Sequence, residues 1–146
     1  MSPAAPATAG YSGTPLAQKL GLKDGQRVLF LDLPKSLADL ASSRDFAAVE
    51  GAGWTALGKA RDLDFVHGFT TSRAVMEDNA KALIAAIRRD GMVWISWPKK
   101  ASKVKTDITE DVIREVLLPT GLVDVKVAAV DEIWSGLKLM IRKELR

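Results

Sequence analysis

The sequence predicts an α/β domain with a mostly parallel, three-layer sheet of about six strands that ends in an antiparallel hairpin. Two observations predict this class. Apolar runs with the character of strands alternate with stretches of helical periodicity, as in βα units joined by right-handed crossovers. The last two predicted strands, 123–130 and 137–142, are joined by a segment too short for a helical crossover, so we expect them to pair antiparallel.

The composition fits one core and excludes several kinds of chemistry. The chain has 146 residues, of which 47% are hydrophobic. It has no cysteine, which excludes thiol catalysis, and its one histidine, His67, excludes metal sites built from several histidines. No apolar run approaches the roughly 20 residues of a membrane helix, and no signal peptide is predicted. We therefore expect a cytoplasmic protein without membrane association.

The N-terminal region is predicted to contain a tail and a short helix. Residues 1–13 have no apolar period and are expected to be a disordered tail, so the single domain is expected to span 14–146. Thr14 followed by a proline is typical of a helix start. Gly21 suits the left-handed position that ends a helix.

The next part of the chain gives a strong strand followed by a weak pattern. Residues 27–33 are apolar on both faces, as in a parallel strand covered by helices. From 34 to 62, several glycines make the boundaries uncertain. A short helix is predicted within 36–43, and one or two short strands within 46–57.

The second half has a clearer order of elements. Capping residues and apolar spacing predict a helix from Ser72 to a stop at Gly91, and a helix that begins at Asp107 or Thr109 and ends at Pro119. Alternation and apolar runs predict strands at 63–69, 92–97, 123–130 and 137–142.

This order of elements resembles the methyltransferase-like variant of the Rossmann fold, in which a final hairpin inserts one antiparallel strand. The phrases GTPLAQKLGL, WISWPKKASKVKTDITEDVIREV and GLVDVKVAAVDEIWSGLKLMIRKE resemble a bacterial family known as a domain of unknown function. The resemblance runs from about residue 10 to the C-terminus. It implies a small α/β domain of the bacterial cytoplasm and assigns no catalytic residues.

The fold rule for open α/β sheets predicts where a ligand would bind. Ligands bind outside the carboxyl ends of the parallel strands, which brings the segments after several strands to one edge. The candidate ligand-binding residues at this edge are Asp32, Lys35, Thr70, Thr71, Ser72, Trp97, Lys99, Lys100, Lys103, Lys105, Asp131, Glu132 and Trp134.

The lysines after residue 98 have three interpretations. They are a solvated loop, a site for a phosphate or carboxylate with help from Thr70, Thr71 or Ser72, or a nucleic-acid surface on which Trp97 or Trp134 stacks bases. A net charge of only +3 and the absence of arginine from the loop argue against nucleic acid.

A nucleotide-like cofactor normally requires a glycine-rich turn after the first strand. Residues 32–36 contain no glycine, and Pro34 removes one N–H donor. Glu50 lies at a suitable distance along the chain to contact a ribose. We predict no cofactor, and S-adenosylmethionine is disfavoured.

Two other candidate groups are expected to be structural. His67 lies within a predicted strand, and a packed or hydrogen-bonded histidine is favoured there over a catalytic base. Asp131 and Glu132 are adjacent, so they point to opposite faces and are expected to satisfy turn donors or nearby lysines rather than to share a metal ion.

These observations favour a non-catalytic module that binds a small anionic ligand or a protein partner at the carboxyl edge. The first alternative is a reduced S-adenosylmethionine-dependent methyltransferase, and the second is a nucleic-acid-associated protein. The charged side of the last predicted strand discourages pairing between sheet edges, which favours a monomer or a weak dimer.

Overall fold

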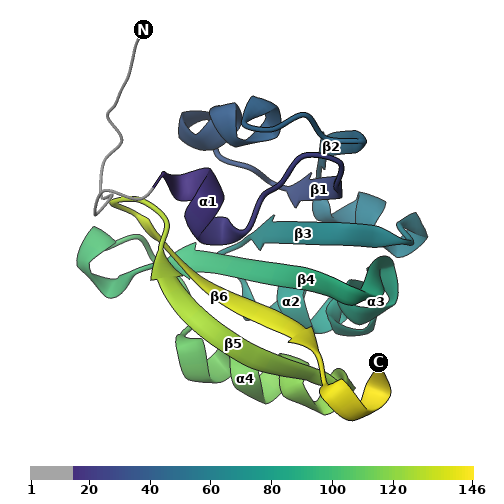
Figure 1. The fold of residues 1–146 in the computed structure, drawn as a ribbon. Helices are drawn as coiled ribbons and strands as arrows, with labels where there is room; N and C mark the ends of the chain where they lie inside the picture. Colours follow the sequence, from purple (N-terminus) through teal and green to yellow (C-terminus); the bar gives the residue numbers. More distant parts are fainter. Residues whose placement is uncertain (1–14) are drawn as a thin grey trace, which may run out of the picture.

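A computed structural model describes residues 15–146 and shows six strands in one sheet (Figure 1). The strands are β1 (Arg27–Leu31), β2 (Ala48–Ala52), β3 (Leu63–Phe69), β4 (Ile87–Pro98), β5 (Leu122–Ala129) and β6 (Trp134–Ile141). Their order is β2-β1-β3-β4-β6-β5. The first four are parallel, and β6 lies antiparallel between β4 and β5. The predicted fold class and its C-terminal hairpin are confirmed.

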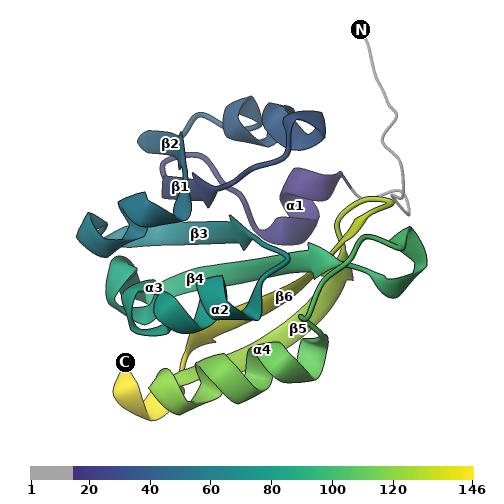
Figure 2. The same ribbon diagram turned by 180° about the vertical axis from the view of Figure 1, so that it is seen from behind.

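Helices cover the two faces of the sheet unequally. The α-helices are α1 (Leu16–Leu20), α2 (Arg73–Asp78), α3 (Ala80–Ala86) and α4 (Glu110–Leu117). The 3₁₀ helices are η2 (Lys35–Ser42), η3 (Trp54–Lys59), η4 (Lys100–Ser102), η5 (Leu118–Thr120) and η6 (Lys143–Leu145). One face, called here the α4 face, packs against η3, α2, α3 and α4 (Figure 2). The opposite α1 face packs against α1 and η2.

The core follows the alternation of side chains along the strands. Leu29, Val66 and Val93 point to the α4 face, whereas the alternate residues Phe65 and Trp94 point to the α1 face. Each of these side chains is no more than 2% exposed. Burial on both faces explains why β1, most of β3 and the second half of β4 are apolar runs in the sequence, whereas the outer strand β2 is exposed.

Two tryptophans join layers of the core through hydrogen bonds. The indole N–H of Trp94 donates to the Leu20 carbonyl at the end of α1, at 2.8 Å. The indole N–H of Trp54 donates to the Phe69 carbonyl at 3.0 Å. The Trp54 ring packs on Gly68, where a Cβ atom would lie 2.4 Å from the ring. A larger residue at position 68 would therefore displace a buried tryptophan.

The predicted helix from Ser72 to Gly91 is confirmed in part, as α2 and α3, but it ends at Ala86 and not at Gly91. Ser72 does cap α2, but the helix is interrupted at Asn79, and Ile87 already belongs to β4 and pairs with Leu63. Gly91 does not end a helix. A Cβ atom at this position would lie 2.8 Å from the Leu63 carbonyl oxygen, so glycine allows two backbone segments to approach closely.

The weakly patterned region contains one strand between two 3₁₀ helices. The short helix predicted within 36–43 corresponds to η2, and β2 lies within the region predicted to hold one or two strands. The segment that begins at Trp54 is helical and not extended, because its apolar residues Trp54 and Leu57 both pack under the sheet. The predicted tail and the predicted cap at Thr14 lie outside the described residues. No helix within 15–146 is long and apolar enough to cross a membrane.

Candidate functional site

The parallel strands end at one edge of the sheet, called here the carboxyl edge. Asp32 follows β1, Thr70 follows β3, Lys99 follows β4 and Asp131 lies just beyond β5. The candidate residues therefore share an edge, as predicted from the order of elements. They do not form one cluster, because they are divided between the two faces of the sheet.

The loop after β4 is tied to the domain at both ends. This lysine loop, residues 99–107, begins where the Lys99 N–H donates to the Ile133 carbonyl in the β5–β6 turn, at 2.7 Å. At its far end, the Thr106 hydroxyl donates to the Thr71 carbonyl at 2.8 Å. Asp107 accepts from the Arg73 N–H at 2.7 Å. The loop is thus held between the C-terminal hairpin and the start of α2.

Internal hydrogen bonds set the shape of the lysine loop. The Ser102 hydroxyl donates to the Lys99 carbonyl at 2.7 Å, and the Val104 N–H donates to the same hydroxyl oxygen at 3.2 Å. Lys103 then adopts a left-handed conformation, with φ of 62°. Such a conformation is costly for a residue with a Cβ atom and is frequent at ligand-binding positions.

Two hollows lie along this loop on the α4 face. The first, called here the lysine hollow, has a volume of about 400 Å³. It is lined by Trp97, Pro98, Lys100, Lys103, Val104, Lys105, Thr106, Ile108 and Thr109. The second, also of about 400 Å³, is lined by Thr71, Ser72, Lys105, Thr106 and Asp107. The two hollows share Lys105 and Thr106, so cationic groups border both of them.

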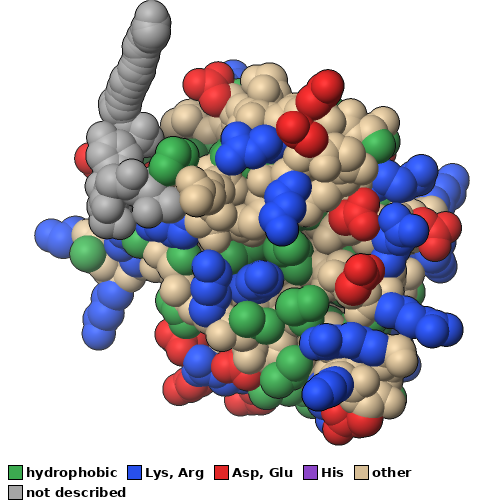
Figure 3. Space-filling view, viewed as in Figure 1, with side chains coloured by type: hydrophobic (Ala, Val, Ile, Leu, Met, Phe, Trp, Pro, Cys, Tyr) green, Lys and Arg blue, Asp and Glu red, His purple; other side chains and the backbone are tan. Residues whose placement is uncertain are grey.

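The charges of the lysine loop differ from those of the neighbouring arginines. Arg73 forms ion pairs with Glu77 and Glu115, which raise the pKa of its guanidinium. Within 15–146, none of the four lysines of the loop forms an ion pair. Lysine and arginine side chains project at the left of Figure 3, where Figure 1 draws this loop. The lysine ammonium groups therefore remain free for an anion.

The turn after β1 has an unusual geometry without glycine. Asp32 is left-handed, with φ of 56°, and its N–H donates to the Ala52 carbonyl at the end of β2, at 2.9 Å. No described residue accepts a hydrogen bond from the backbone N–H of Lys35 or Ser36, as expected for the first turn of a helix. Asp32 is exposed, so this turn offers free N–H donors and a carboxylate.

Glu50 does not lie where a ribose contact was expected. Glu50 is the third residue of β2, so it lies within the strand and not after it. It lines a hollow at the opposite ends of the strands, where β1, β2 and β3 begin. β2 ends at Ala52 and is followed by Gly53, and neither residue carries a carboxylate. The nearest acid there is Asp32, whose Oδ1 would lie 3.7 Å from a Cβ atom placed at Gly53.

The hydroxyls after β3 support the turn. Thr70 is 9% exposed, and its hydroxyl oxygen accepts from the Ser72 N–H at 3.1 Å. The Ser72 hydroxyl oxygen in turn accepts from the Val75 N–H and caps α2. Thr71 is exposed and contributes its carbonyl to the anchor of the lysine loop. Of these three residues, Thr71 and Ser72 line a hollow.

The β5–β6 turn is separated from the lysine hollow. Asp131 accepts from the N–H groups of Ile133 and Trp134 at 2.8 and 2.7 Å, so it has the turn role predicted for it, and Glu132 is exposed. Trp134 packs edge-on against Phe69 on the α1 face, with ring centroids 5.3 Å apart. Trp97 is 8% exposed and lies on the α4 face. The two tryptophans therefore do not form one stacking surface.

His67 is sealed in the core on the α1 face. It is fully buried, its Nε2 lies 2.7 Å from the Ser96 hydroxyl, and its ring stacks on Phe69 at 4.2 Å. Burial lowers the pKa of His67 to about 3, so the imidazole is neutral at physiological pH. This agrees with a packed, hydrogen-bonded strand histidine. The sequence does not identify Ser96 as the partner of His67, because the register of β3 against β4 cannot be read from it.

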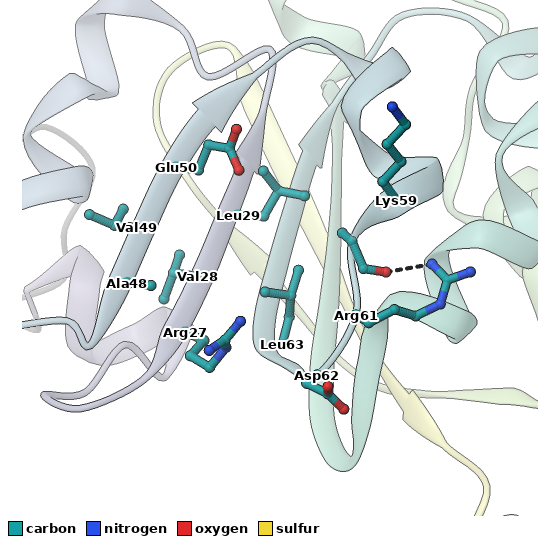
Figure 4. Close-up of a pocket in the computed structure, with 11 residues that line it drawn as sticks. Arg27, Val28, Leu29, Ala48, Val49, Glu50, Lys59, Arg61, Asp62 and Leu63 are labelled. Carbon is teal, nitrogen blue, oxygen red and sulfur yellow. Dashed lines mark hydrogen bonds between the residues drawn. The ribbon is translucent and has the colours of Figure 1, made fainter.

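A further hollow, of about 600 Å³, lies at the opposite edge of the sheet, where β1, β2 and β3 begin (Figure 4). No pattern in the sequence predicts this hollow. This amino-edge hollow is lined by Arg27, Val28, Leu29, Ala48, Val49, Glu50, Lys59, Ala60, Arg61, Asp62 and Leu63. The Arg61 guanidinium donates to the carbonyls of Gly58 and Ala60. Among the described residues, no group of three or more histidine, aspartate or glutamate side chains is placed to hold a metal ion.

No family model and no curated protein matches the sequence. Solved structures do match the fold. A methyltransferase dependent on S-adenosylmethionine (SAM) from Aquifex aeolicus has 16% identity and a TM-score of 0.62, over 85% of this chain and 86% of that one. Magnesium protoporphyrin IX methyltransferase from Synechocystis, with bound SAM, has 15% identity and a TM-score of 0.60, over 85% and 73%.

A third similar structure is a TehB-like SAM-dependent methyltransferase from Corynebacterium glutamicum. It has 14% identity and a TM-score of 0.54, over 87% of this chain and 85% of that one. The three proteins have low sequence identity to this chain but match its fold over 85% or more of its length. The chain therefore has the methyltransferase-like Rossmann fold.

Proposed function

We propose that this chain is a reduced SAM-dependent transferase whose carboxyl edge takes the cofactor and an anionic substrate at neighbouring positions. The observation that supports it is the similarity to a SAM-dependent methyltransferase over 85% of the chain. This similarity favours the transferase over the non-catalytic module that was predicted first from the sequence.

The crevice between β1 and β3 is the expected position for the cofactor. The chain passes from β1 to β2 on one side of β1, and then returns to β3 on the other side of β1. The space beyond the ends of β1 and β3 is therefore the switch point of the sheet. The carboxylate of SAM suits the free N–H groups of Lys35 and Ser36, and its ammonium suits Asp32. When bound, SAM supplies a methyl group activated by a sulfonium. The chain's own contribution is to bind and orient.

The lysine hollow is the expected position for the substrate. Its lysines offer unpaired cations, and Trp97 and Ile108 form part of an apolar lining. This combination suits a small molecule with an anionic group and an apolar body. Because β3 and β4 are adjacent strands, the hollow lies beside the cofactor crevice at the same edge.

Thermal melting with SAM and S-adenosylhomocysteine tests the cofactor assignment. A ligand that binds the folded state raises the melting temperature with increasing concentration, by mass action. Asp32→Asn should weaken that shift, whereas the control Asp39→Asn, which removes the same charge from an exposed position on η2, should not. If neither compound shifts the melting of the unmodified chain, the transferase proposal is rejected.

A second candidate is the module that binds an anion without a cofactor. It is favoured by the first turn, where Pro34 lacks an N–H donor and no glycine lets the backbone approach a ligand closely. It predicts that inorganic phosphate raises the melting temperature while SAM does not.

One pair of variants tests the lysine hollow in either case. Replacing Lys103 and Lys105 with alanine should remove the phosphate response, whereas Lys81→Ala, an exposed lysine on α3, should keep it. A response that survives the double replacement would place the anion elsewhere. A short oligonucleotide in the same titration tests the nucleic-acid alternative.

A further inference from the structure

The two edge strands of the sheet differ in how they are protected from pairing. On one side of the sheet, the outermost strand is β5. Its pairing with β6 shifts in register between Asp124 and Lys126, and its charged residues alternate with apolar ones. At the other edge, β2 is exposed along most of its length, and its single charged residue is Glu50. Proteins normally blunt sheet edges with bulges, prolines, charges or covering helices. The short length of β2 is its main protection.

The backbone groups of β2 that face away from β1 are available for pairing. The Ala48 N–H donates to the Gln26 carbonyl, and the Ala52 carbonyl accepts from the Asp32 N–H, so these alternate residues point toward β1. Because successive residues of a strand alternate in direction, the peptide groups of Val49 and Gly51 point to the free side. Val49 is 43% exposed and, as Figure 4 shows, lies at this side of β2.

We propose that two copies of this chain associate through antiparallel pairing of their β2 strands, with the two Val49 residues opposite each other. A two-fold axis at Val49 lets each Val49 exchange its N–H and carbonyl with the other copy. It also brings the two exposed valine side chains together on the α1 face, where Val49 lies in register with Val28.

Charge complementarity selects this register over its neighbours. With the axis at Val49, Glu50 of the second copy lies opposite Ala48, which is itself in register with Arg27 on β1. Glu50 and Arg27 are on the same face of the sheet, so each glutamate can approach an arginine of the other copy. With the axis at Glu50, two carboxylates would face each other, which is unfavourable. With the axis at Gly51, Glu50 would lie near Asp32 and not near Arg27.

The amino-edge hollow fits the same arrangement. Its lining has three cations, Arg27, Lys59 and Arg61, and two acids, Glu50 and Asp62. A glutamate from the second copy would therefore balance its charge. Since the pairing involves a short strand, its buried area is expected to fall below the roughly 1,200 Å² of stable interfaces, giving a weak and concentration-dependent dimer.

Disulfide trapping tests the register directly, because the natural sequence contains no cysteine. In the proposed dimer the two Val49 Cα atoms are about 5.5 Å apart, within the range for a disulfide. Val49→Cys should therefore form a covalent dimer under mild oxidation. Gly51→Cys should not, because its two copies would be about 13 Å apart. Val127→Cys, with a similar exposure of 46% on the opposite edge strand, should remain monomeric.

Charge exchange gives a second test that does not depend on oxidation. In sedimentation velocity, Glu50→Lys should weaken the concentration-dependent association, and adding Arg27→Glu should restore it. Melting curves show whether each variant is folded. The proposal is overturned if Val49→Cys stays monomeric, if Gly51→Cys links as fast as Val49→Cys, or if the double charge exchange fails to restore association in folded protein.

Discussion

Two groups of polar side chains, one within strands β3 and β4 and one in the loop that follows β4, differ in whether solvent and ligands can reach them. His67 and Ser96 lie within β3 and β4 on the α1 face, covered by apolar and aromatic side chains. The lysine loop follows the last residue of β4 and lies open at the carboxyl edge. The histidine is the more versatile group chemically, yet the lysines are the ones that a ligand can reach. Access, and not residue type, separates the structural polar groups from the candidate site.

This difference predicts opposite responses to substitution. On the sealed side, a change should alter the free energy of unfolding and leave anion binding intact. On the open side, a change should alter anion binding and have little effect on stability. Substitutions at His67, Gly68 and Lys103 test these expectations, and their effects on stability are expected to decrease in that order.

The largest effect is expected from His67 and depends on pH. The pKa of His67 is about 3 in the folded chain and about 6.5 when unfolded, so the unfolded state binds a proton first as the pH falls. The folded chain should therefore lose up to about 5 kcal/mol of stability between pH 6.5 and pH 3, and roughly 2 kcal/mol of this above pH 5. His67→Leu removes this contribution. Urea denaturation across this range measures it.

Comparison of the two pH profiles decides the outcome. Carboxylates titrate at lower pH, so the difference between the unmodified chain and His67→Leu is informative above about pH 5. If the free energy of unfolding changes with pH above pH 5 in the same way for the two proteins, burial does not keep the imidazole neutral. The contrast between His67 and the lysine loop would then be wrong.

An intermediate effect is expected at Gly68, beside the same histidine. An alanine Cβ atom would lie 2.4 Å from the ring of Trp54, which is 7% exposed and cannot move freely. Gly68→Ala should lower the free energy of unfolding by about 1 to 3 kcal/mol, measured by denaturant titration. Gly58→Ala is the matched control, since no atom lies within 4 Å of the Cβ position there. Equal effects of the two substitutions would contradict the packing argument.

The smallest effect on stability is expected at Lys103. Its left-handed conformation, with φ of 62°, is strained for lysine and natural for glycine. Lys103→Gly should raise the free energy of unfolding by up to about 1 kcal/mol while it weakens the phosphate response of the lysine hollow. A variant that loses stability would contradict the argument that the Lys103 backbone is strained. A variant that binds phosphate as before would show that the Lys103 side chain does not hold the anion.

The sequence predicted most of the architecture because its signals were local. Ser72 and Thr109 cap helices through their own side chains, and Gly21 takes the left-handed position that ends α1. The boundary at Ile87 was missed because the same apolar spacing serves the end of a helix and the start of a buried strand. The packing of Leu63 against Gly91 decides between them, and that contact is long-range.

The candidate site was predicted less completely than the fold. The position of the lysine loop follows from the order of the strands, and Asp131 has the turn role expected for it. The separation of Trp97 from Trp134 was missed, because it depends on which way each side chain points from neighbouring strands. The amino-edge hollow was missed for a similar reason: the strand starts that form it are far apart in the sequence.

Strand β4 has a consequence for the timescale on which the carboxyl edge can rearrange. It pairs with β3 on one side as far as Ser96, and with β6 on the other side as far as Pro98, the residue before the lysine loop. Amide hydrogens of a central strand exchange with solvent only in rare, extensive openings, whereas those of a short edge strand such as β2 exchange in local fluctuations. The lysine loop therefore follows a central strand that is expected to open only rarely, so a ligand bound there would meet a site that is already in place.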